Sequence, residues 1–105
     1  MGKFEFTDLG DGHFALSGDA SFQTAETILR ASEKVFAGHS NLEVNLAAVE
    51  ETDSAGLALL LEWISRAANT GSEIRFADIP EKIKAIAVTA EINELLERAY
   101  SSSSK

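Results

Sequence analysis

The residues with the clearest chemical potential lie in segment 52–56 (TDSAG), directly before the apolar run 57–64. Asp and Ser are preferred at helix starts, so Asp53 or Ser54 is expected to cap a helix. Backbone N–H groups at a helix start attract anions, so a phosphate on the Ser54 hydroxyl would be tolerated by its own helix. Asp53, Ser54 and Ala55 are therefore candidates for partner binding, and Ser54 is also a candidate for phosphorylation.

Nucleophilic catalysis by Ser54 would need a base held beside the hydroxyl. The two histidines of the chain are His13, in a predicted strand, and His39, in a predicted turn. The sequence places neither near Ser54, and the serine is not part of a G-x-S-x-G motif. We therefore expect a protein that is not an enzyme.

The acidic residues do not predict a metal site. They gather in two groups, Glu50-Glu51-Asp53 and Glu91-Glu94-Glu97. Their spacing matches no calcium-binding loop, and a chain without cysteine has no thiolate ligand for zinc. A glycine-rich phosphate loop is also missing, so no nucleotide site of that kind is expected. The sequence predicts neither a metal nor a cofactor.

Length and charge narrow the class of protein further. With 105 residues the chain predicts one domain over residues 1–100, followed by a disordered polar tail at 101–105. A formal net charge of −8 disfavours nucleic acid as a partner, because phosphate backbones repel an acidic protein. The longest apolar run, 56–61, is far shorter than the ~20 residues of a membrane span. We expect a cytoplasmic protein without direct membrane insertion.

Hydrophobic periodicity predicts the element order β-β-α-β-α-β-α-α. The expected strands are 4–7, 13–17, 42–46 and 73–77, and the expected helices are 22–37, 54–69, one from Pro80 and a short one from Asn93. Asp11-Gly12 predicts a hairpin turn, while Gly38 and Gly71 are expected to end the first two helices. Strands that alternate with helices predict an α/β fold with largely parallel pairing.

The helix 54–69 has two apolar faces when its residues are placed at 100° intervals. The predicted core stripe consists of Leu57, Leu60, Leu61, Ile64 and Ala68, and the opposite face of Ala55, Leu59, Glu62, Trp63 and Arg66. Leu59 and Trp63 are four residues apart, so their side chains should meet. Because Trp and Arg often dominate binding energy, this outer face is predicted to be a partner interface. The alternative is that the last helix or a loop covers it.

The element order resembles that of the STAS domain family (sulfate transporter and anti-sigma-factor antagonist), from Phe4 to about Leu96. The resemblance rests on the motif 53–57 (DSAGL) between the third strand and the second helix. Gly18-Asp19 followed by Thr24-Ala25-Glu26 also resembles the family's loop into its first helix. The resemblance to this family implies an α/β fold with a mixed, mainly parallel sheet of about four strands and helices packed on it.

Two branches of the family imply different partners. In anti-sigma-factor antagonists, a partner kinase phosphorylates the serine at the position of Ser54, and a second serine usually stands where this chain has Ala55. The run 56–61 and Gly71 resemble more closely the small STAS subunit of the Mla-type phospholipid-transport ABC system. That branch implies binding to the ABC ATPase, and through it to the permease, on the cytoplasmic side of the inner membrane. An anti-sigma kinase is the alternative partner.

Overall fold

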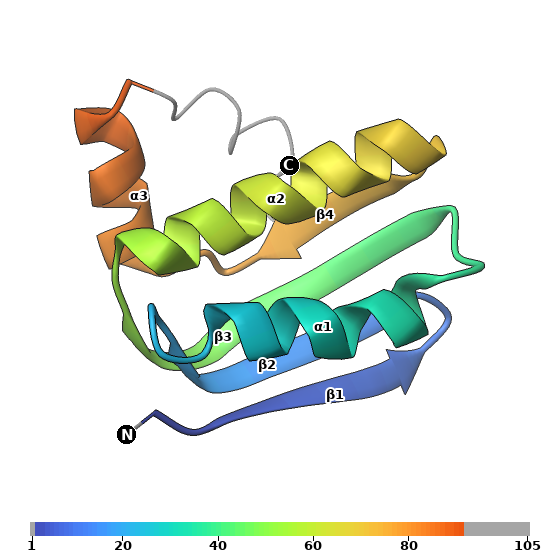
Figure 1. Cartoon of the computed structure of the whole chain (residues 1–105), viewed down its shortest axis with the longest axis horizontal. Helices are drawn as coiled ribbons and strands as arrows, with labels where there is room; N and C mark the ends of the chain where they lie inside the picture. The colour runs from blue at the N-terminus through green and yellow to red at the C-terminus, as the bar shows by residue number, and fades with distance from the viewer. Residues whose placement is uncertain (1, 92–105) are drawn as a thin grey trace.

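The structure, a computed structural model, describes residues 2–91 and shows a four-stranded sheet with three helices (Figure 1). The elements are β1 (Phe4–Gly10), β2 (His13–Ala20), α1 (Ala25–Phe36), β3 (Asn41–Thr52), α2 (Ser54–Thr70), β4 (Glu73–Ala77) and α3 (Glu81–Thr89). The predicted order is confirmed for these seven elements. The helix expected from Asn93 and the tail expected at 101–105 lie outside the described residues.

The sheet has the strand order β1-β2-β3-β4 and mixes both kinds of pairing. The β1–β2 hairpin is antiparallel, whereas β2, β3 and β4 run parallel to one another. The parallel strands follow each other across the sheet in one direction, so two right-handed crossovers place their helices on the same face. Figure 1 accordingly shows α1 and α2 side by side over one face of the sheet.

The hydrophobic core lies between this helix layer and the sheet, as strand β3 illustrates. Leu42, Val44 and Leu46 are buried, while Glu43 and Asn45 between them are half-buried on the other face. This alternation follows from the two-residue period of a strand. The sheet therefore has one face packed under helices and one face carrying polar or small side chains.

The ends of α2 follow ordinary capping chemistry, whereas both ends of α1 differ from the prediction. Helix α2 ends at Gly71, whose left-handed backbone (φ 76°) lets its N–H reach the last carbonyls of the helix. Helix α1 begins at Ala25, three residues later than predicted, because Thr24 is its N-cap and residues 22–24 form a turn. It ends at Phe36, one residue earlier than predicted, because Ala37 rather than Gly38 is its C-cap. The carboxyl ends of the parallel strands share one end of the sheet, so the β2–α1 and β3–α2 connections lie there together (Figure 1).

Candidate partner-binding site at the start of helix α2

Asp53 is the N-cap of α2, and each of its carboxylate oxygens accepts a backbone hydrogen bond. Oδ1 accepts from the N–H of Ala55 at 2.9 Å, which satisfies one of the free donors of the first helical turn. Oδ2 accepts from the N–H of Phe22 at 3.2 Å, in the loop before α1. One carboxylate therefore caps α2 and ties the β2–α1 loop to it.

The first turn of α2 is held close to the sheet because residue 56 has no side chain. A Cβ added at Gly56 would lie 2.1 Å from Thr52 Oγ1 and 2.6 Å from the carbonyl oxygen of Ala20. The Thr52 hydroxyl donates to that same carbonyl oxygen at 2.9 Å, inside the protein. The start of α2 is thus fixed against the ends of β2 and β3, and it forms a rigid base for the residues around it.

Ser54 is exposed on this rigid base, directly after the capping aspartate, while Ala55 is half-buried. Both histidines lie at the opposite end of the sheet. His13 Nε2 is 3.6 Å from Glu43 Oε1 near the start of β3, and His39 precedes that strand and packs edge-on against Phe14. Within residues 2–91 the geometry therefore gives the Ser54 hydroxyl no imidazole base, and the exposure of Ser54 allows a partner to reach it.

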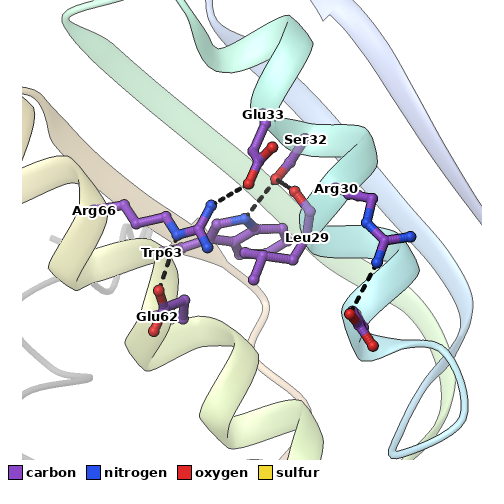
Figure 2. Close-up of polar contacts among 8 residues, drawn as sticks. Leu29, Arg30, Ser32, Glu33, Glu62, Trp63 and Arg66 are labelled. Atoms are coloured by element: carbon purple, nitrogen blue, oxygen red, sulfur yellow. Dashed lines mark hydrogen bonds and ion pairs between the residues drawn. The ribbon is translucent and has the colours of Figure 1, made fainter.

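The predicted exposure of Leu59 and Trp63 is wrong. Leu59 is 3% exposed and Trp63 only 2%, so both belong to the core. Trp63 donates from Nε1 to the Ser32 hydroxyl of α1 at 2.8 Å (Figure 2). Its ring packs among Phe6, Phe36 and Phe76. Neither side chain offers surface to a partner, and both are withdrawn from the partner-binding set.

The error arose because α2 is apolar around most of its circumference. The buried residues of α2 are Gly56, Leu57, Leu59, Leu60, Trp63 and Ala67, while Leu61 and Ile64 are only partly buried and Ala68 is exposed. The buried face is centred roughly a quarter of a turn from the predicted stripe. Gly56 and Ala67 were the available signals, because small residues mark where a helix approaches its neighbours closely.

Arg66 lies on the surface between two glutamates rather than on a free binding face. Its Nε donates to Glu62 of the same helix at 2.9 Å, and its Nη1 donates to Glu33 of α1 (Figure 2). These hydrogen bonds, the one to Glu33 first, raise the pKa of Arg66 above its ordinary value. Because Glu33 belongs to α1, the cluster of Glu33, Glu62 and Arg66 links α1 to α2. Glu62 is exposed and Arg66 half-buried, so the cluster lies beside the solvent-facing side of α2.

Phe22 is the residue at this end of the sheet that the sequence analysis did not single out. It is 83% exposed, and its backbone is bonded to the Asp53 carboxylate. The predicted helix 22–37 included Phe22, which instead lies in the turn before α1; the available signal was a large aromatic residue in the polar segment Ser21-Phe22-Gln23. The described site thus includes Phe22 beside Asp53, Ser54 and Ala55.

A cavity of about 590 Å³ lies at the other end of the helix pair, between the last turns of α1 and α2. Ser32, Trp63 and Arg66 line it, and the Ser32 hydroxyl, the indole N–H and two guanidinium nitrogens of Arg66 are engaged in the hydrogen bonds described above. Across residues 2–91, no group of three or more His, Asp or Glu side chains is arranged to hold a metal ion. Within the same range, the helices are too short or too polar to cross a bilayer.

The family model described as "Mlab, STAS domain" matches residues 7–97 of the chain. The chain belongs to this STAS domain family. The match covers most of the protein, including the whole sheet from Thr7 onward and the start of α2. No curated protein sequence matches the chain significantly.

Solved structures share the STAS fold at low sequence identity. A putative anti-sigma factor antagonist from Thermotoga maritima is 16% identical, with a TM-score of 0.69 over 94% of this chain and 84% of that one. The anti-sigma factor antagonist SpoIIAA in its unphosphorylated form is 10% identical, with a TM-score of 0.68 over 96% and 88%. The STAS domain of a SulP transporter from Vibrio cholerae is 23% identical, with a TM-score of 0.56 over 87% and 72%. The predicted STAS fold is confirmed.

Proposed function

We propose that this STAS protein is a non-catalytic subunit that binds and stabilises the ATPase of a Mla-type phospholipid-transport ABC system. The observation that carries the proposal is the Ser54 hydroxyl, exposed on a rigid, capped helix start in a chain of the Mlab-type STAS family. Because the backbone at the start of α2 is already packed against the sheet, a partner has to order only the serine side chain to form a directional hydrogen bond.

The contact surface would follow the solvent-facing side of α2 from its first turn. Ser54, Ala58 and Glu62 are exposed there at intervals of four residues, so they form one stripe along the helix. Ala55 lies beside the stripe, and Asp53 caps the helix at the start of the stripe. Arg66 forms an ion pair with Glu62 at the other end of the stripe. Small side chains at 54, 55 and 58 would let a partner approach the helix closely.

The ATPase would supply all nucleotide chemistry in this complex, and the STAS subunit would act through contact alone. Its location would be the cytoplasmic side of the inner membrane, held there through the ATPase and the permease. The alternative is an anti-sigma-factor antagonist whose partner kinase phosphorylates Ser54. Both proposals place the partner at the same helix start, so the identity of the partner decides between them.

Co-purification from cells tests the proposal. The tagged wild-type protein is expected to recover an ABC ATPase and its permease. Ser54→Arg should abolish this recovery because a long cationic side chain would stand in the contact. The matched control is Ser40→Arg, an exposed serine in the α1–β3 loop at the opposite end of the sheet, which should retain the partners.

Two results would contradict the transporter proposal. Recovery of a histidine-kinase-like protein without an ATPase, together with a phosphate on Ser54 by intact mass, would favour the anti-sigma alternative. Equal recovery of the ATPase by wild type and by Ser54→Arg, with both proteins folded, would move the contact away from α2.

A further inference from the structure

Phe22 is unusual because its large apolar ring faces water in a well-fixed loop. The large hydrophobic residues that are exposed within residues 2–91 are Phe22 (83%), Leu9 (60%) and Val88 (59%). Single exposed hydrophobic residues are common on protein surfaces, so exposure alone indicates little. The informative point is that the backbone N–H of Phe22 is hydrogen-bonded to Asp53, the N-cap of α2, where the proposed contact begins.

The backbone of the loop that carries Phe22 is held by hydrogen bonds at Ser21, at Phe22 itself and at Thr24. Thr24 is 4% exposed, and its hydroxyl donates to the Asp19 carbonyl oxygen at 2.7 Å and accepts from the Ser21 N–H at 3.1 Å. The Phe22 N–H is bound by Asp53 at 3.2 Å. The backbone is therefore fixed while the ring stays exposed. Such a residue can be buried by a partner without the cost of ordering its loop.

The charge around Phe22 is strongly negative, which limits the kind of partner that fits. Segments 19–26 and 50–55 contain five acids and no Lys or Arg; the acids are Asp19, Glu26, Glu50, Glu51 and Asp53. Arg30 pairs with Glu26 at 2.9 Å, and Lys3 adds one positive charge where its carbonyl oxygen accepts from the Asp19 N–H. The β4–α3 connection and the first turn of α3 are together balanced, with two acids and two lysines (Asp78, Glu81, Lys82 and Lys84).

We propose that Phe22 is the anchor of this interface and inserts into an apolar pocket ringed by Lys and Arg on the partner protein. Electrostatic complementarity favours a basic partner surface, and an aromatic side chain at the centre of an interface commonly dominates the binding energy. Insertion of the ring into a membrane is disfavoured, because anionic lipid surfaces repel the surrounding carboxylates. The inference deepens the proposed function, and takes from it the ABC ATPase as the partner.

The decisive measurement is the affinity of the purified STAS protein for the ATPase recovered by co-purification. Phe22→Ala should weaken binding about tenfold or more, while Phe22→Leu should restore part of the affinity by keeping apolar area. Leu9→Ala is the matched control, because Leu9 is an exposed apolar residue on β1 at the other end of the sheet, and it should bind as wild type. Affinity should fall as ionic strength rises. All three variants should unfold at the wild-type midpoint.

Three binding results would contradict the anchor role. One is wild-type affinity for the ATPase in Phe22→Ala. Another is Phe22-dependent binding to phosphatidylglycerol vesicles in place of protein. Weaker binding in both Phe22→Ala and Leu9→Ala by the same factor would also count against it, because a specific pocket would not respond at both ends of the sheet.

Photo-crosslinking separates failure of the anchor from failure of the proposed function. Benzoylphenylalanine at position 22, compared with position 9, should crosslink the ATPase in cells. If a different protein is captured at 22 and its purified complex is weakened by Phe22→Ala, the anchor stands and the transporter proposal fails. If position 22 captures no protein above the level at position 9, the anchor role is wrong, even where the ATPase still co-purifies.

Discussion

The first and third turns of α2 differ in the contacts that determine their structure: local hydrogen bonds in the first turn, and packing against distant elements in the third. In the first turn, Asp53 accepts a backbone N–H two residues away and Ser54 stays exposed, which is local capping chemistry. In the third turn, Trp63 is buried by residues of α1, β1 and β4. The comparison teaches that a helix start can be predicted from a few residues, whereas the buried face of an apolar helix depends on its neighbours.

Replacing the buried tryptophan should have the largest effect on the third turn. Trp63→Ala should lower the free energy of unfolding by about 3–5 kcal/mol, because it leaves a large cavity and removes aromatic contacts. Urea denaturation followed by circular dichroism measures the loss. An unchanged midpoint would show that Trp63 is on the surface after all, and would restore the interface first predicted for it.

A smaller loss should follow from removing the partner of the indole N–H. The Ser32 hydroxyl, 1% exposed, accepts this N–H and donates to the Leu29 carbonyl oxygen at 2.7 Å (Figure 2). Ser32→Ala should cost about 1–3 kcal/mol, since a buried donor is left unpaired. In a Trp63→Phe background, which has no such donor, the same substitution should cost much less. Equal costs in the two backgrounds would argue against the hydrogen bond.

The smallest effect is expected in the first turn, where Asp53→Ala removes the cap. The expected cost is about 1 kcal/mol, and Asp53→Asn should lose less because asparagine is also a good N-cap. The loss should be local: in Asp53→Ala the Phe22 and Ala55 amides should exchange hydrogen faster, while core amides of β3 change little. Protection of both amides at wild-type levels would show that Asp53 does not join the two loops.

Local signals predicted much of the fold. The alternation in β1 and β2, the Asp11-Gly12 turn, the cap at Asp53 and the helix end at Gly71 each depend on neighbouring residues, and each matches the structure. These features are encoded by backbone conformation and by short-range hydrogen bonds. They suffice to order the elements, and the crossover rule then brings the β2–α1 and β3–α2 loops to one end of the sheet.

The orientation of α2 and the role of Phe22 needed contacts between distant segments. Leu57, Leu61 and Ile64 look as suitable for the core as Leu59 and Trp63, and periodicity does not rank two apolar faces on one helix. The choice depends on α1, which supplies Ser32 to the indole. In the same way, nothing near Phe22 in the sequence indicates that its backbone is bound by Asp53, 31 residues away.

The position of Trp63 also gives the protein a built-in spectroscopic probe. It is the only tryptophan of the chain, and it lies where α1, α2 and the sheet meet. Its fluorescence should be blue-shifted in the folded state and should move to longer wavelength when α1 separates from α2. A partner that binds the first turn of α2 should leave this emission almost unchanged, so loss of structure and occupation of the site can be followed independently in one unlabelled sample.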